Sequence, residues 1–153
     1  MRALFSLLLL STAVPIQARS PIAILQELNA LYGGSVRFKI DQEDRLVTDL
    51  FDHTGHFRQD VVYIEFLDTA GFKYSEEEAA LVLTCASDHA NCIEKEVFRM
   101  NVIRHTGRSV LPVPAGDAEG SRAIGLLVAL VGEAQQAIAQ KAAETHARPQ
   151  RKR

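Results

Sequence analysis

The chain has 153 residues, of which 47% are hydrophobic and 24% charged, and its formal net charge is −2. This composition is typical of a single soluble globular domain. It excludes a disordered chain and a collagen-like repeat, and the two cysteines are too few for a disulfide-dense miniprotein.

The first 18 residues have the features of a secretory signal peptide. Arg2 is basic, Leu4 to Leu10 is apolar, and the segment ends at Ile16-Gln17-Ala18. The apolar block is shorter than the roughly 20 residues that cross a bilayer, so it does not predict a membrane anchor. We expect cleavage after Ala18 and a secreted or periplasmic protein.

The other end, residues 146–153, predicts a disordered basic tail that contains Arg148, Arg151, Lys152 and Arg153. Without these four residues and Arg2, the 17 basic residues fall to 12 against 19 acidic ones, a net charge of −7. Such an acidic body does not resemble a nucleic-acid-binding surface. The tail is interpreted either as a solubilising segment or as one that contacts anionic surfaces.

The mature chain begins with a helical pattern inside the segment 19–34. Ser20 can cap a helix and Pro21 suits its first position. Apolar residues then recur at helical spacing until Gly33-Gly34, so the sequence predicts a helix over 21–32.

From residue 35 onward, apolar residues recur at every second position instead of at helical spacing, which is typical of strands. About seven strands are predicted, over 36–40, 46–51, 57–66, 72–74, 79–85, 92–104 and 109–113. The polar segments between them are too short for crossover helices, so the strands should pair antiparallel.

After Pro114 the helical period returns, with Asp117 as a plausible cap. The densest apolar block of this final helix, Ala123 to Val131, is far shorter than a membrane span, so we expect the helix to pack on the core. The expected fold class is α+β and mostly β. It is a curled sheet or partly open barrel in a single domain over 35–145, capped by this C-terminal amphipathic helix.

This element order, from Val36 to about Ile138, resembles the pleckstrin-homology-like fold. In that fold two near-orthogonal antiparallel sheets are closed at one corner by a C-terminal helix. Its phosphoinositide-binding members carry basic residues on the first hairpin, whereas here Asp41, Glu43 and Asp44 occupy that hairpin. The resemblance therefore implies a fold but not phosphoinositide binding.

Cys85 and Cys92 are the strongest single feature of the sequence. They are expected to end one strand and begin the next, as facing positions of an antiparallel hairpin, and export would place them in an oxidising compartment. The sequence therefore predicts a Cys85–Cys92 disulfide. Two alternatives remain open: zinc or copper bound by these cysteines with His89, and a redox switch.

No catalytic constellation is recognisable, and neither a cofactor nor enzymatic activity is predicted. His53 and His56 lie in one expected turn beside carboxylates. Together with His89 they are the weak metal-ligand candidates. The first functional hypothesis is an exported, non-catalytic domain that binds a protein, peptide or envelope component by a sheet edge or a loop.

Two further functional hypotheses stay open beside it. One is an apolar-ligand carrier, with the ligand between the sheet and the helix at Ile124 to Val131. The other is a metal-binding protein or a small periplasmic hydrolase.

Overall fold

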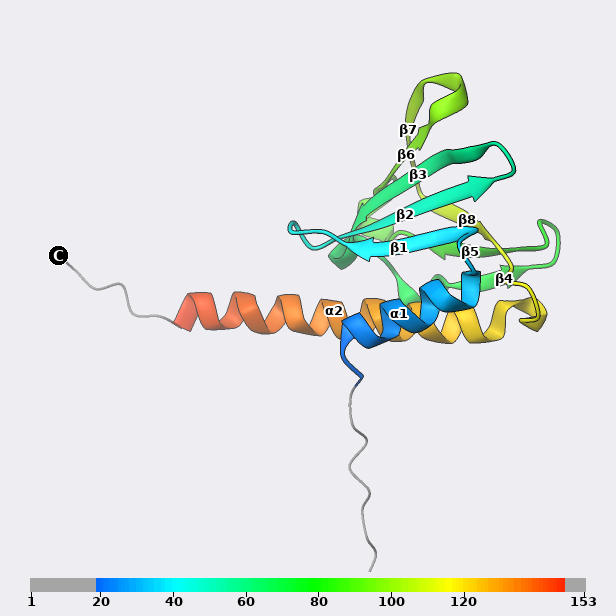
Figure 1. The fold of residues 1–153 in the computed structure, drawn as a ribbon. Helices are drawn as coiled ribbons and strands as arrows, with labels where there is room; N and C mark the ends of the chain where they lie inside the picture. The colour runs from blue at the N-terminus through cyan, green and yellow to red at the C-terminus, as the bar shows by residue number, and fades with distance from the viewer. Residues whose placement is uncertain (1–18, 148–153) are drawn as a thin grey trace, which may run out of the picture.

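The computed structural model describes residues 19–147, so the predicted signal peptide and residues 148–153 lie outside the described part. Within it, two α-helices and eight strands follow one another: α1 (Pro21–Tyr32), β1 (Val36–Ile40), β2 (Arg45–Asp52), β3 (Gly55–Tyr63), β4 (Lys73–Ser75), β5 (Ala80–Thr84), β6 (Ile93–Val97), β7 (Val102–Thr106), β8 (Arg108–Pro112) and α2 (Ser121–Ala147). The α+β class and the antiparallel pairing are confirmed (Figure 1).

The first helix forms as the sequence predicts. The Ser20 hydroxyl accepts a hydrogen bond from the amide of Ala23, Pro21 is the first helical residue, and Gly33 ends the helix with a φ of 57°. The apolar side of α1, including Leu28, packs against α2 and β1.

The segment 92–104, predicted as one long strand, is two strands. A 3-10 turn over Phe98–Met100 and a left-handed Asn101, with a φ of 47°, reverse the chain between β6 and β7. Asparagine is one of the few residues that adopts this conformation at low cost. The hairpin raises the strand count from the predicted seven to eight.

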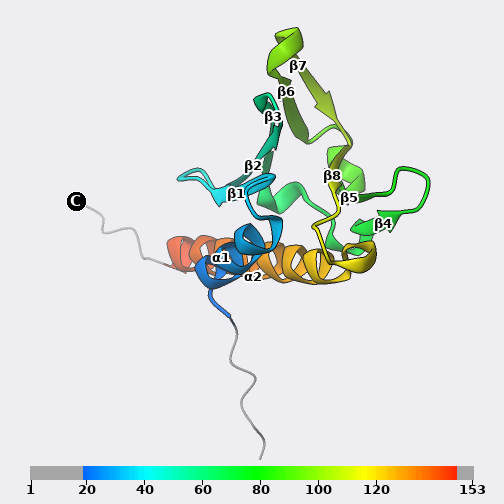
Figure 2. The ribbon, with the colours of Figure 1, turned by 45° about the vertical axis from the view of Figure 1, so that its right-hand side comes forward.

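The predicted barrel or curled sheet is wrong. The strands form two open sheets, with the orders β1-β2-β3-β6-β7 and β4-β5-β8, and both β1 and β7 are edge strands (Figure 2). The chain leaves one sheet and enters the other at Gly107, directly between β7 and β8. This change of sheet leaves β7 at an edge, where a closed barrel would require a further neighbour.

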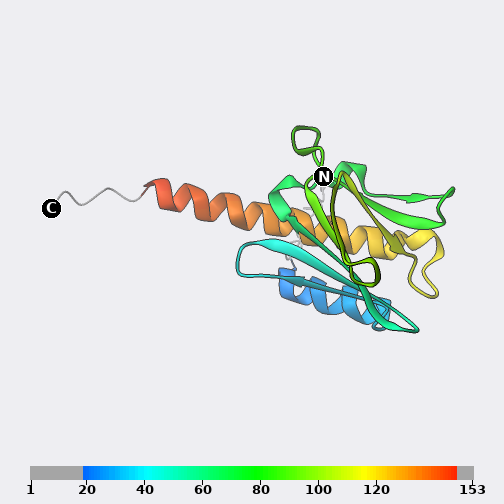
Figure 3. The ribbon, with the colours of Figure 1, turned by 90° about the horizontal axis from the view of Figure 1, so that it is seen from above.

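The last helix, α2, runs beneath both sheets, and its first half completes the core with fully buried Leu127, Leu130 and Val131. Its second half extends past the sheets (Figure 3) and continues to Ala147, two residues into the predicted tail. In the described part, the helical stretch Ala118–Ala147 is long and apolar enough to span a membrane by length and composition. A core helix passes the same test, and this one is packed in the core over its first half.

Candidate interaction surfaces

The two cysteines are joined in a disulfide, with their Cα atoms 5.9 Å apart. The pairing is the predicted one, but the reasoning that led to it was wrong, because β5 and β6 do not form a hairpin. β5 pairs with β4 and β8, whereas β6 pairs with β3 and β7. The disulfide therefore closes a loop that connects the two sheets.

This disulfide loop, residues 85–92, supports the point at which the chain changes sheets. The amide of Cys85 donates to the carbonyl of Gly107 at 3.0 Å. A Cβ atom at position 107 would lie 2.4 Å from the carbonyl oxygen of Ala90, so the loop and the β7–β8 junction fit together only with glycine there.

The three histidine candidates for metal binding are dispersed. His89 stacks on Phe66 at 3.9 Å between ring centroids, and the disulfide leaves neither cysteine as a thiolate ligand beside it. His53 is exposed in the β2–β3 turn. Among residues 19–147, no group of three or more histidine, cysteine or acidic side chains is arranged to hold a metal ion.

His56 has an identifiable structural role instead. Its Nε2 lies 3.2 Å from the Asp49 carboxylate, and its ring contacts the rings of Phe51 and Phe98 at 4.8 and 4.6 Å. Because Phe98 belongs to the β6–β7 turn, His56 packs β3 against the turn of that hairpin.

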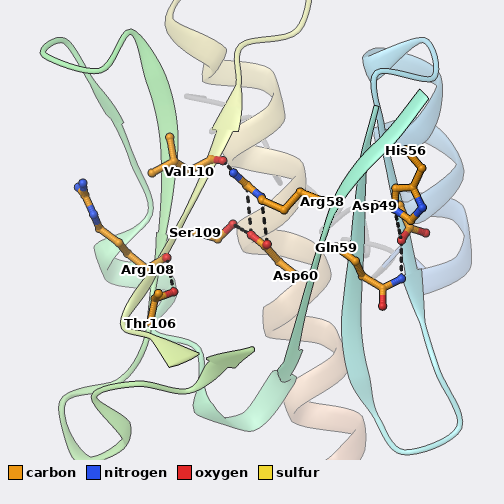
Figure 4. Close-up of polar contacts among 9 residues, drawn as sticks. All are labelled: Asp49, His56, Arg58, Gln59, Asp60, Thr106, Arg108, Ser109 and Val110. Carbon is orange, nitrogen blue, oxygen red and sulfur yellow. Dashed lines mark hydrogen bonds and ion pairs between the residues drawn. The ribbon is translucent and has the colours of Figure 1, made fainter. Parts of the chain in front are cut away.

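A buried polar cluster joins the two sheets (Figure 4). The Asp60 carboxylate on β3 accepts hydrogen bonds from the Ser109 hydroxyl on β8 and from Arg58 Nη2, the latter at 3.1 Å. Arg58 Nη2 also donates to the carbonyl of Val110 at 2.6 Å. Arg58 Nε lies 3.0 Å from the second Asp60 oxygen, which is an ion-pair distance without hydrogen-bond geometry. The arginine thus contacts both sheets.

Two more cations continue this cluster toward the edge of the larger sheet. In the register, Asp60 on β3 faces Lys95 on β6, and Lys95 faces Arg104 on β7, so all three side chains lie in one row on the inner face. Burial lowers the pKa of Lys95, with Arg58, Arg108 and Arg104 adding to the effect and Asp60 opposing it. Asp60 therefore forms an ion pair with Arg58 and also favours the charged form of Lys95.

The row was not predicted from the sequence. Asp60 could have been noticed locally, because it has the same strand parity as the apolar Val62, which points into the core. Lys95 and Arg104 could not have been recognised from the local sequence, because their place in the row with Asp60 depends on the pairing of β3, β6 and β7.

The two edges of the larger sheet differ in accessibility. On β1, the side-chain amide of Asn29 donates to the carbonyl of Phe38 and accepts from its amide, at 2.9 and 2.7 Å, so α1 already closes this edge. On β7, β6 is the only paired strand among residues 19–147, and Ile103, Arg104 and His105 are exposed. The β7 edge is therefore the open one.

The same hairpin carries exposed apolar side chains at its tip. Phe98, Met100 and Ile103 are 38, 57 and 60% exposed. Figures 1 and 2 both show the β6–β7 hairpin pointing away from the two helices. Phe98 and Met100 lie in the turn of the hairpin and Ile103 lies on β7, so the projecting end of the hairpin exposes large apolar residues, which is typical of an interaction surface.

A second apolar surface lies at the other end of the molecule, between the helices. A groove of about 300 Å³ is lined mainly by apolar side chains of α1, α2 and β1, including Ile22, Leu25, Ile40 and Ile138, with Asp44 and Lys141 also lining it. It lies further along α2 than Ile124 to Val131, where Leu127 and Leu130 fill the space that the ligand-carrier hypothesis required.

No family model, no curated protein and no solved structure matches this chain. The resemblance to the pleckstrin-homology-like fold thus extends only to antiparallel sheets and a long C-terminal helix. A functional assignment has to rest on the geometry of the chain itself.

Proposed function

We propose that this protein is an exported, non-catalytic binding domain that adds an extended polypeptide segment to its β7 edge. The observation that carries the proposal is the asymmetry between the two edges. Asn29 closes β1, whereas β7 presents a five-residue edge with exposed side chains. A free edge strand can bind a partner through backbone hydrogen bonds, with alternate side chains adding specificity.

The disulfide loop and the buried cluster support this proposal by fixing β7 in place. The loop packs against the β7–β8 junction, and Arg58 and Asp60 tie β3, which lies two strands from β7 in the same sheet, to β8 of the second sheet. An edge that is ordered before binding loses less conformational entropy when a peptide adds to it. Export to an oxidising compartment, which the proposed signal peptide would provide, suits the disulfide.

A matched pair of variants tests the location. Ile103→Lys changes an exposed isoleucine on β7, and Ile22→Lys changes a comparably exposed one on α1; the two side chains are 60 and 69% exposed. Peptides are first selected for binding to the wild-type protein from a displayed random library. These peptides should bind Ile103→Lys much more weakly than the wild type and should bind Ile22→Lys as tightly as the wild type. If the peptides keep the same affinity for both variants, or lose affinity only for Ile22→Lys, the β7 edge is excluded as their binding site.

A second candidate function, binding of an apolar ligand, is favoured by the groove between α1 and α2. Grooves of this size that are lined by apolar side chains accept small lipid-like molecules. Native mass spectrometry of protein purified from its host, without a delipidation step, tests it. A bound mass that Ile22→Lys removes would support it, whereas a clean apo mass would count against it.

A further inference from the structure

The chemistry of the segment that β7 accepts can be inferred from the rows of side chains that end at this strand. An added strand continues each row by one residue, and side chains that face each other across neighbouring strands interact directly. The chemistry of this partner rests on the proposed function, because the partner binds at that same edge.

On the inner face, the row Asp60, Lys95, Arg104 ends in two adjacent cations. Arg104 is exposed and, in the part of the chain that the structure describes, forms no ion pair. The residue next to Arg104 on an added strand would therefore be most favourable as an aspartate or glutamate.

On the outer face, the row Asp49, Gln59, Glu96 ends in Ile103. Ile103 is exposed and lies close in sequence to the other apolar residues of the hairpin tip, Phe98 and Met100. The residue next to Ile103 on an added strand would bury apolar surface if it were itself apolar. Because Ile103 and Arg104 are consecutive in β7, the apolar and the acidic residue that they favour are also consecutive in the added strand.

The charge of the surrounding chain favours the same partner. Residues 97–116 contain Arg99, Arg104 and Arg108 and no acidic residue, although the body of the protein is acidic. Two of these arginines are already paired, Arg99 with Asp52 and Arg108 with Glu78, which leaves Arg104 to face a ligand.

We infer that the β7 edge recognises an extended polypeptide in which apolar and acidic residues alternate, the apolar side chain packing beside Ile103 and the carboxylate beside Arg104. The backbone of the segment forms the hydrogen bonds of a sixth strand in the larger sheet. The alternating side chains make this segment bind more tightly than segments of other sequence.

Synthetic peptides of about nine residues, long enough to cover the strand, test this inference. One alternates valine and glutamate, a second alternates valine and lysine, and a third has the composition of the first with its valines and glutamates in separate blocks. Binding to the full protein is measured by fluorescence anisotropy at about 0.15 M salt, where distant charges are screened. We expect the alternating acidic peptide to bind about tenfold more tightly than either of the others.

Charge reversal at Arg104 gives the sharper result. Arg104→Glu should reverse the preference, so that the valine–lysine peptide binds more tightly, and Arg104→Gln should abolish the preference without reversing it. Both substitutions are at an exposed residue, so the variants should keep the wild-type unfolding transition.

The possible failures are distinguishable. If both alternating peptides bind equally and Ile103→Lys weakens both, the edge binds peptide but the inferred selectivity is wrong. If no peptide binds at millimolar concentration, the proposed function itself is wrong. Vesicles containing one-quarter phosphatidylglycerol in phosphatidylcholine form a separate arm. Binding of vesicles without peptides, lost in Ile103→Lys, would replace the inference with a membrane-contacting role for the hairpin.

Discussion

The substitution Asp60→Asn tests whether the buried cluster holds the two sheets together. The Asp60 side chain is only 3% exposed and the Arg58 side chain 15%. Removing one partner of a buried ion pair costs about 3–5 kcal/mol, because the remaining charge stays buried. Arg58 keeps its hydrogen bond to Val110 and some contact with water, so we expect the lower end of this range, about 3 kcal/mol.

The measurement is the free energy of unfolding in urea, followed by far-ultraviolet circular dichroism. Glu78→Gln is the control, because it breaks the exposed ion pair with Arg108 and should cost less than about 1 kcal/mol. The double variant Arg58→Met/Asp60→Leu replaces both charges with apolar groups and should recover part of the loss; recovery stays incomplete because the Ser109 hydroxyl and Lys95 lose Asp60 as well. If Asp60→Asn destabilises the protein no more than Glu78→Gln does, the cluster does not stabilise the association of the sheets.

Three further predictions concern stability. Gly107→Ala should lower the free energy of unfolding in urea by about 1–3 kcal/mol, because its Cβ would overlap the carbonyl of Ala90. The control Gly132→Ala adds its Cβ to open space and should be neutral or slightly stabilising. Equal changes in the two variants would show that the β7–β8 junction tolerates a side chain. Cys85→Ala should lower stability by about 2–3 kcal/mol under oxidising conditions and hardly change it under reducing ones, and an equal loss in both would indicate a packing effect. Burial alone would raise the pKa of Asp41, but hydrogen bonds outweigh burial and lower this pKa, so the group contributes stability above its unfolded pKa of about 4 and loses it as the pH falls through the folded value. Asp41→Asn should therefore weaken the dependence of the unfolding free energy on pH in this acid range. An unchanged pH dependence in the variant would contradict the assignment.

Local patterns predicted the features that depend on neighbouring residues. The limits of α1 followed from Ser20, Pro21 and Gly33, because caps act within one turn. The antiparallel class followed from the short connections. The hairpin between β6 and β7 was missed because its reversal depends on a single left-handed residue, Asn101, within an otherwise strand-like stretch.

Features that depend on long-range pairing could not be predicted in the same way. The disulfide was predicted correctly, but the hairpin that was expected to bring the two cysteines together does not form, because their strands belong to different sheets. The row Asp60, Lys95, Arg104 and the closure of β1 by Asn29 require the register of the whole sheet. Those two features are the ones on which the proposed binding edge depends.

Amide hydrogen exchange with and without the alternating valine–glutamate peptide tests the central claim most directly. The proposal predicts slower exchange of amides within β7, residues 102–106, and unchanged exchange in β1, whose outer edge Asn29 already occupies at Phe38. Slower exchange confined to α1 and α2, or no change in β7 when the peptide is bound, would contradict it.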